Sequence, residues 1–272
     1  MDDTVRVASS VPPAGRSPWA DLDRPPLRVR ALRRALEPDG WRVEVLERTG
    51  STNAVVAERA RAGEPAGLVV VAELQTAGRG RLDRTWQSPP RAGLTFSVLL
   101  RPTWPEQEWP WLPLLTGLAV ARALREQAEL EAVLKWPNDV LVADRKLCGV
   151  LAEVPLPGAA VVGMGLNVTT RADELPHDRA TSVRLEEGAT TDRETLLRAV
   201  LRALRDGLAD PGTARAQYRA LCTTIGRQVA VELPSRPAVT GTAERVDDAG
   251  QLVVDGIAYA AGDVVHAGPL TP

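Results

Sequence analysis

The chain contains very few cysteines, histidines and methionines, and the scarcity of cysteine and histidine argues against certain kinds of site and of catalysis. Its 272 residues include two cysteines, two histidines and two methionines. Cys148 and Cys222 lie far apart and in no ligand spacing, which argues against a disulfide framework or a zinc site. Because His177 and His266 are its only histidines, the sequence gives little support for acid–base or nucleophilic catalysis by side chains.

Long apolar runs are missing as well. No uninterrupted run approaches the ~18 residues that a membrane helix requires, and the N-terminus lacks the charged-then-apolar order of a signal peptide. A formal net charge of −2 provides no global basic field that would recruit nucleic acid or an anionic membrane. We therefore expect a cytoplasmic enzyme that binds neither DNA nor membranes.

The hydrophobic pattern predicts an α+β fold in three parts. Residues 1–26 are rich in Pro, Ser and Asp, which predicts a flexible tail. In residues 27–224 strands and helices do not alternate strictly, so we expect a mixed β-sheet with packed helices rather than a doubly wound parallel sheet. Residues 225–272 contain short alternating runs and the hairpin signal Asp255-Gly256, which predict a small β-barrel.

The predicted elements of the larger part follow from the positions of its apolar residues. Residues 114–130 place Leu114, Leu118 and Ala121 along one helical face. Thr191 and Glu194 have the spacing of a capping box, which predicts the start of a second long helix. The other expected elements are helices over 27–36 and 52–62 and strands over 41–46, 68–73 and 94–100.

The most informative segment is residues 78–86, where three arginines stand among glycines just before Trp86. Glycine lets the backbone approach a ligand closely. Arginine presents a planar fork of donors that suits phosphate and carboxylate oxygens. The segment therefore predicts a mobile loop that grasps an anion, with the indole as an apolar lid.

Three further motifs contain polar side chains at the ends of predicted elements. Ser51-Thr52-Asn53 is a helix-start signal, where side chains lie beside unpaired backbone N–H groups. Residues 135–153 predict a β-hairpin with Lys146 in its turn, and residues 161–168 predict a buried strand that ends near an amide. Together with the arginines, these cations suit a reaction that brings two anions together, such as carboxylate attack on the α-phosphate of ATP.

In their order and spacing, the four motifs between residues 50 and 168 resemble those of the biotin protein ligases and, more distantly, the lipoate ligases. The resemblance implies a class II synthetase-like catalytic domain of the biotin/lipoate ligase type over 27–224 and an SH3-like barrel over 225–272. It implies that biotin and ATP, with Mg²⁺, form biotinoyl-5′-AMP. Biotin is then transferred to a specific lysine of a biotin carboxyl carrier domain of an acyl-CoA carboxylase.

The resemblance also assigns roles to residues of this sequence. The catalytic residues would be Lys146 and Arg81. The biotin site would comprise Ser51, Thr52, Asn53, Gln75, Gly78, Arg79, Gly80, Arg81, Lys146 and Gly149. The nucleotide site would comprise Arg79, Arg81, Arg84, Trp86, Lys135, Asn138 and Asn167, and Mg²⁺ would be held by Asp139.

Two alternatives stay open. A lipoate ligase would apply the same chemistry to a longer, sulfur-containing acid, although residues 78–81 and 135–139 favour biotin. A DNA-binding repressor would need a helix-turn-helix domain, but only about fifty residues with one short helix precede Ser51. We therefore expect the monofunctional ligase, and the sequence leaves open whether it forms a weak homodimer.

Some of these residues also have an ordinary structural interpretation. As a bare motif, Ser51 is a helix N-cap and Lys146 is a solvated hairpin tip. Asp83 stands where the family pattern usually has glycine, and we expect its carboxylate to pair with Arg84 or Arg81. We interpret as structural the tryptophans Trp104, Trp109 and Trp111 and the thiol of Cys148.

Overall fold

The computed structural model describes residues 23–82, 84–233 and 237–266. Its largest element is a seven-stranded sheet in the order β1-β2-β5-β9-β8-β7-β6. Within it β1 and β2 pair in parallel, and all other neighbours pair antiparallel. The strands span Arg42–Leu46 (β1), Leu68–Ala72 (β2), Gly93–Leu100 (β5), Val133–Lys135 (β6), Asp139–Val142 (β7), Arg145–Leu156 (β8) and Ala159–Asn167 (β9).

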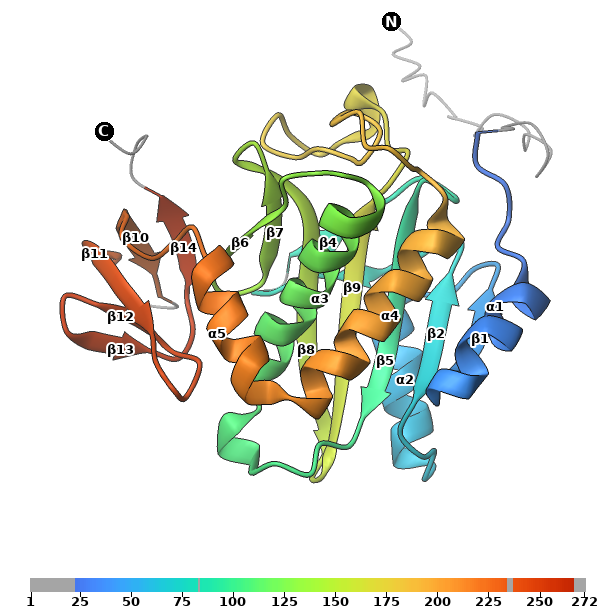
Figure 1. Ribbon diagram of the computed structural model, residues 1–272, viewed down its shortest axis with the longest axis horizontal. Helices are drawn as coiled ribbons and strands as arrows, with labels where there is room; N and C mark the ends of the chain where they lie inside the picture. The colour runs from blue at the N-terminus through green and yellow to red at the C-terminus, as the bar shows by residue number, and fades with distance from the viewer. Residues whose placement is uncertain (1–22, 83, 234–236, 267–272) are drawn as a thin grey trace, which may run out of the picture.

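Helices cover both faces of this sheet, with α1, α3 and α4 on one face and α2 on the other (Figure 1). Because strand side chains alternate between faces, neighbouring residues of β2 belong to different cores. Val69 and Val71 pack in the larger core with α3 and α4, whereas Val70 packs under α2. The helices span Val29–Leu36 (α1), Thr52–Arg61 (α2), Trp111–Gln127 (α3), Arg193–Ala209 (α4) and Pro211–Leu221 (α5).

The predicted capping box at the start of α4 is wrong. Asp192 is the N-cap, and its carboxylate accepts hydrogen bonds from the backbone N–H groups of Glu194 and Thr195. Instead of reaching back to Thr191, the Glu194 carboxylate is buried and pairs with Arg28 at 3.0 Å. The Glu194 side chain, which the local pattern assigned to the helix cap, therefore pairs with Arg28 from a distant part of the chain.

The predicted flexible tail lies mostly outside the described residues. Of residues 1–26, only 23–26 are described, and Arg24 and Pro25 among them make contacts with the rest of the folded unit. The Arg24 side chain is buried and pairs with Glu174, and the carbonyl of Pro25 accepts a hydrogen bond of 2.6 Å from Arg193. This segment therefore forms part of the folded unit.

The C-terminal strands form a second, five-stranded antiparallel sheet in the order β13-β12-β11-β10-β14. Asp255 and Gly256 turn between β12 and β13 with φ of 46° and 78°, as the hairpin signal predicted. The sheet fits an SH3-like module whose edge strands β13 and β14 do not close onto each other. Its strands span Gln228–Glu232 (β10), Val239–Val246 (β11), Leu252–Val254 (β12), Ile257–Tyr259 (β13) and Asp263–His266 (β14).

Two tryptophans join this module to the larger unit. The Trp111 indole N–H donates to the carbonyl of Asp248 at 2.9 Å, and that of Trp136 donates to Gly250 at 3.1 Å. Both rings are buried, and the guanidinium group of Arg219 lies 5.1 Å from the Trp111 ring. The structural interpretation of the tryptophan cluster thus agrees with the contacts of Trp111, and Figure 1 shows the five-stranded sheet beside α5.

Candidate functional site

A cleft of about 820 Å³ contains nearly all the residues that the sequence singled out. It is bounded by the seven-stranded sheet, the residue 78–86 loop and the edge strand β14 of the C-terminal module. Of the predicted site residues only Gly78 does not line it. Those that do are Ser51, Thr52, Asn53, Gln75, Arg79, Gly80, Arg81, Arg84, Trp86, Lys135, Asn138, Asp139, Lys146, Gly149 and Asn167.

The floor of the cleft is the glycine-lined face of β8 and β9, on the side of the sheet that α2 covers. Gly149 and Gly165 are direct partners across these strands. A Cβ atom on Gly165 would stand 2.3 Å from Cε2 of Trp86, and one on Gly163 would stand 2.1 Å from Oδ1 of Asn53. Only glycine permits this close approach, so the floor is shaped to accept flat or bulky groups.

The neutral polar side of the cleft begins at the N-terminus of α2. Ser51 is the N-cap residue, but its hydroxyl makes no capping hydrogen bond. The backbone N–H of Thr52 instead donates to Oε1 of Gln75 at 2.7 Å. The ordinary N-cap interpretation of Ser51 is therefore wrong with respect to its side chain, which lines the cleft.

Asn53 differs from its neighbours because its amide is used within the protein. Its Oδ1 accepts from the hydroxyl of Ser97 at 2.6 Å. Its Nδ2 donates to a carboxylate oxygen of Glu153 at 2.6 Å and to the carbonyl of Leu151 at 3.3 Å. Both N–H donors of this amide are thus engaged, and Asn53 is 4 % exposed.

The arginine loop is a small hairpin made by β3 (Gly78–Arg79) and β4 (Thr85–Trp86). Arg81 donates to the carbonyl of Gly262 at 3.1 Å, and Arg84 pairs with Asp263, so two of its arginines contact the C-terminal module. The described part of the loop is therefore held against β14 by polar contacts. Asp83, whose carboxylate we expected to pair with one of these arginines, lies outside the described residues.

Gly78 has a structural reason for being glycine. A Cβ atom there would stand 2.3 Å from the carbonyl oxygen of Trp86 and 2.8 Å from Nε2 of Gln75. The small residue lets β3 pair closely with β4, and so places Trp86 over Gly165 and Gly149.

The cationic side of the cleft is formed by β6, β7 and β8. Nζ of Lys146 lies 2.6 Å from Oδ1 of Asp139, above Gly149. Burial lowers the pKa of Lys135, an effect that the nearby charge of Asp139 opposes and that of Lys146 reinforces. Burial likewise lowers the pKa of Arg81. Because the ammonium group of Lys135 and the guanidinium of Arg81 are partly removed from water, an anion between them would be bound favourably.

The positive charge of the residues that line the cleft and its unpaired N–H donors both favour an anionic ligand. Seven lysines and arginines line the cleft against four aspartates and glutamates, although the whole chain has a net charge of −2. Among the described residues, three buried N–H groups of the cleft have no hydrogen-bond partner: Nε of Arg81, Nε1 of Trp86 and Nε of Arg227. Buried donors normally find acceptors, so these groups suit a ligand rich in oxygen.

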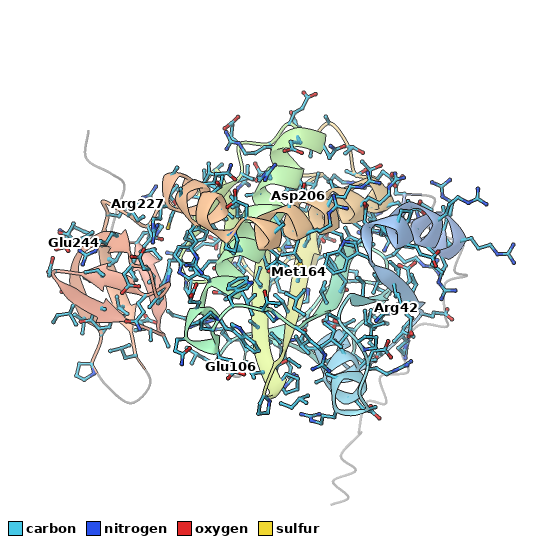
Figure 2. All side chains as sticks on the ribbon, turned by 60° about the horizontal axis from the view of Figure 1, so that its bottom comes forward. Arg42, Glu106, Met164, Asp206, Arg227 and Glu244 are labelled. Carbon is cyan, nitrogen blue, oxygen red and sulfur yellow. The ribbon has the colours of Figure 1, made fainter. Side chains whose placement is uncertain are left out.

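Several residues of the site were not predicted from the sequence. Ser97, Glu153, Arg179, Arg227 and His266 lie in or beneath the cleft. Arg227 donates to Nδ1 of His266 at 3.2 Å, and Nε2 of the same ring lies 3.1 Å from Oγ1 of Thr224. Figure 2 shows Arg227 where the C-terminal sheet meets the larger unit. Glu153 ends the 135–153 motif but no role was predicted for it, and the other four stand in no motif, so no local signal identified them.

The protein offers little for a metal ion by itself. No group of three or more His, Cys, Asp and Glu side chains suited to a metal occurs within residues 23–82, 84–233 and 237–266. Asp139 is the carboxylate beside the lysine, and its buried Oδ1 has an ion-pair partner but no hydrogen bond. A single carboxylate fits a Mg²⁺ ion that arrives with a nucleotide, since phosphates and water supply most of its ligands.

Comparison with known proteins decides the family. Residues 45–167 match the model of the "Biotin/lipoate A/B protein ligase family". The chain is 44% identical over 263 residues to the biotin–[acetyl-CoA-carboxylase] ligase of Mycobacterium tuberculosis, covering 90% of this chain and 98% of that relative. The chain belongs to the biotin/lipoate protein ligase family. The resemblance inferred from the four motifs is thereby confirmed.

Other members of the family show the same relationship. The bifunctional ligase/repressor BirA of Escherichia coli is 34% identical over 232 residues, which cover 80% of this chain and 70% of that protein. The biotin protein ligase of Aquifex aeolicus, solved in complex with biotin and ATP, superposes with a TM-score of 0.72 at 30% identity, over 83% of this chain and 99% of that one. The α+β fold class is confirmed by this likeness. No helix in the described parts of the chain has the length and apolarity to cross a membrane.

Proposed function

We propose that the cleft is the active site of an ATP-dependent biotin–protein ligase of the biotin–[acetyl-CoA-carboxylase] ligase type. The observation that carries this proposal is the division of the cleft across the sheet. Neutral polar groups of Ser51, Thr52 and Gln75 follow β1 and β2 along the chain, and Thr52 contacts Ser97 on β5. Lys135 and Lys146 lie on β6 and β8, toward the β6 edge of the sheet. Biotin has a neutral ring and a carboxylate, and ATP supplies the second anion.

In the first step a biotin carboxylate oxygen attacks the α-phosphorus of ATP. A new P–O bond forms, the bond to the β-phosphate breaks, and biotinoyl-5′-AMP and pyrophosphate result. The ammonium group of Lys146 and the guanidinium of Arg81 would hold the two anions together and stabilise the charge that develops between them. No general base is needed, because the attacking carboxylate is already ionised.

The neutral end would bind the ureido ring of biotin. The hydroxyls of Ser51 and Thr52 and the amide of Gln75 provide donors and acceptors without charge. Gly80 and Gly149 would let the acid approach the backbone closely. The resemblance also placed Asn53 and Gly78 in this site, and we propose that both support it indirectly. The Asn53 amide is engaged within the protein, and Gly78 pairs with the backbone of Trp86.

The nucleotide would occupy the part of the cleft between the loop and the C-terminal module. Trp86 would cover the adenylate, and Arg79, Arg84 and Lys135 would face the phosphates. The Asn138 amide donates to the carbonyl of Val150 at 2.8 Å, and that of Asn167 donates to Thr181 at 3.0 Å, so both amides are oriented. Mg²⁺ would accompany ATP with Asp139 as its protein ligand, neutralising phosphate charge.

In the second step a lysine amine of a carrier domain attacks the acyl carbon. The C–O bond to AMP breaks, the amine loses a proton, and biotin is left in amide linkage. We propose a biotin carboxyl carrier domain of an acyl-CoA carboxylase as this partner, in line with the name of the relative from M. tuberculosis.

We further propose that residues 27–224 form the catalytic unit and residues 225–272 the C-terminal unit. The change from a seven-stranded to a five-stranded sheet after α5 supports this boundary. A cytoplasmic location is supported by Cys148 and Cys222, which are both buried and unpaired, as suits a reducing compartment.

Pyrophosphate exchange into ATP tests the proposed activity. Labelled pyrophosphate should enter ATP when biotin and Mg²⁺ are both present, because the first step is reversible and needs no carrier. Omission of biotin or of Mg²⁺ should abolish exchange. A parallel reaction with lipoate decides the substrate class, and exchange with lipoate but none with biotin would make the chain a lipoate ligase.

A further inference from the structure

A chain of hydrogen bonds runs beneath the neutral end of the cleft. Ser97 is fully buried on β5, and its hydroxyl lies 2.7 Å from that of Thr52 and 2.6 Å from Oδ1 of Asn53. The Ser97 hydroxyl is the donor in both contacts, and it shares its one proton between Thr52 and the amide oxygen of Asn53, which can only accept. The Thr52 hydroxyl and backbone N–H in turn donate to Oε1 of Gln75 at 3.0 Å and 2.7 Å.

These donor and acceptor roles orient both amides of the neutral end. Because Oε1 of Gln75 faces Thr52, Nε2 remains as the donor group of a side chain that lines the cleft. Because Oδ1 of Asn53 faces Ser97, both of its N–H donors point to β8. The hydrogen bonds therefore form one continuous network from Gln75 to Glu153.

Glu153 is the last residue of this hydrogen-bond network and also contacts the arginine loop. Its Oε2 accepts from Nδ2 of Asn53 at 2.6 Å and from Arg79 at 2.9 Å. Its side chain is 31 % exposed, and that of Arg79 is 49 % exposed. One carboxylate oxygen thus joins a buried residue beneath the biotin end to the first arginine of the loop.

We propose that Glu153 is a positioning residue of the ligation reaction, which couples the neutral end of the cleft to the arginine loop through Asn53 and Arg79. The inference rests on the proposed function, since it takes the neutral end as the biotin site. A ligand that fixes the conformation of residues 51–53 would, through Asn53, also fix the position of the Glu153 carboxylate that binds Arg79. Biotin and nucleotide would then each favour binding of the other, because such coupling is reciprocal.

The charge of Glu153 is what the coupling requires. A carboxylate oxygen can accept from an amide and a guanidinium at once, and hydrogen bonds to a charged group are about twice as strong as neutral ones. Replacement by glutamine keeps the size but removes the charge and turns half of the group into a donor. Glu153→Gln should therefore release Arg79 while it leaves the sheet intact.

The test measures the dissociation constant of biotin by calorimetry with and without α,β-methylene-ATP, whose α,β bridge cannot be cleaved and which therefore cannot transfer AMP to biotin. In the wild type the analogue should tighten biotin binding by about tenfold, within the usual range of coupling between sites. In Glu153→Gln the ratio of the two constants should fall to within about twofold of one. Biotin alone should also bind about tenfold more weakly, because Asn53 loses a charged partner.

Glu44→Gln is the matched control. Glu44 pairs with Arg59 at 3.2 Å, and the two side chains are 35 % and 46 % exposed, close to the values for Glu153 and Arg79. The pair lies on β1 and α2 outside the cleft, so this variant should keep the wild-type ratio. If Glu153→Gln does not fold, Arg79→Gln breaks the same contact from the loop and should also lose the coupling.

The outcomes separate this inference from the proposed function. If the wild type shows no biotin-dependent pyrophosphate exchange, the proposed function fails. If exchange is present but the wild-type ratio is already close to one, or Glu153→Gln and Arg79→Gln retain the wild-type ratio, the role of Glu153 is overturned and the ligase activity stands.

Discussion

Lys146 shows how much of the site depends on a single side chain. Lys135 and Lys146 are the only lysines of the chain, which otherwise uses arginine for its basic residues, and both line the cleft. A lysine offers a compact, strongly hydrated charge where arginine offers a broad planar fork. The contact of Lys146 with Asp139 above Gly149 places that compact charge on the floor where the proposed carboxylate and phosphate would meet.

Lys146→Ala should slow formation of the adenylate by about 10²-fold or more, because it removes a preorganised electrostatic partner of the transition state. Single-turnover measurement of adenylate formation checks this. Arg145→Ala is the control, since Arg145 lies in the same hairpin but pairs with Glu186 and should change the rate by no more than about threefold. Equal rates for the two variants would leave Lys146 as a lysine of strand β8 with no part in adenylate formation.

The buried His266 should make the free energy of unfolding depend on pH. Burial lowers the pKa of His266 to about 4, helped by the charges of Lys135 and Arg227 and opposed by that of Asp144. An unfolded histidine titrates near 6.5. Between these values the unfolded state binds the additional proton, so stability is lost as the pH falls from about 6.5 to about 4.

Urea unfolding at pH 7 and pH 5 measures this effect, with His266→Gln as the comparison. The wild type should lose more free energy of unfolding between the two pH values than the variant does, because glutamine has no proton to bind. If both proteins lose the same amount, His266 is protonated in the folded state and its contact with Arg227 must be rearranged.

At the scale of elements, the hairpin β3–β4 and the strand pair β8–β9 form one unit through glycine. Gly165 has no side chain and the Trp86 ring lies directly on its backbone, while Gly78 allows β3 to approach the backbone carbonyl of Trp86 on β4. The position of the aromatic lid is therefore decided by glycines on two different elements.

Gly165→Ala should displace Trp86, because the new Cβ would stand 2.3 Å from its ring. We expect a KM for ATP raised by about tenfold, the effect of losing one aromatic contact, together with an unchanged melting temperature. Steady-state adenylation and thermal unfolding measure the two quantities. Gly117→Ala is the control, since its Cβ would meet Leu134 at an ordinary 3.5 Å, and a similar rise in KM there would contradict the assignment.

At the scale of the whole molecule, the cleft needs both sheets. Arg81 and Arg84 from the loop contact Gly262 and Asp263 of the C-terminal module. The module is in turn held by Trp111 and Trp136, whose indoles donate to the turn around Gly250. A small five-stranded sheet thus forms one wall of the site, and the tryptophans keep that wall in place.

Trp111→Ala should lower the free energy of unfolding by about 3–5 kcal/mol, as expected for truncation of a fully buried tryptophan. Urea unfolding provides the measurement. Trp104→Ala is the matched control, because its ring is only half-buried and also lies near Arg215. A loss at Trp111 no greater than that at Trp104 would show that the module is held by other contacts.

The sequence by itself determined what depends on neighbours along the chain. The periodicity of apolar residues identified the strands of the large sheet and helices α1 to α4 to within a few residues, although it did not predict α5. Asp255-Gly256 forms a turn where the hairpin signal stood. The loop, Ser51 and the hairpin of Lys146 were found because glycine, cap and turn chemistry are local. Lys146 itself lies on β8, just after the turn at Ala143 and Asp144. The family, too, was apparent from the order of four motifs.

Only the tertiary structure decided which distant residues meet. Asn53 and Glu153 are a hundred positions apart, and no periodicity relates them. No local feature predicted that Glu194 would pair with Arg28 instead of capping the helix, or that His266 would contact Arg227. Such pairs depend on how sheets and helices pack, since a buried polar group bonds to whichever partner the packing brings within reach. For this reason the sequence could predict residues that line the cleft, whereas it could not predict the network that joins them.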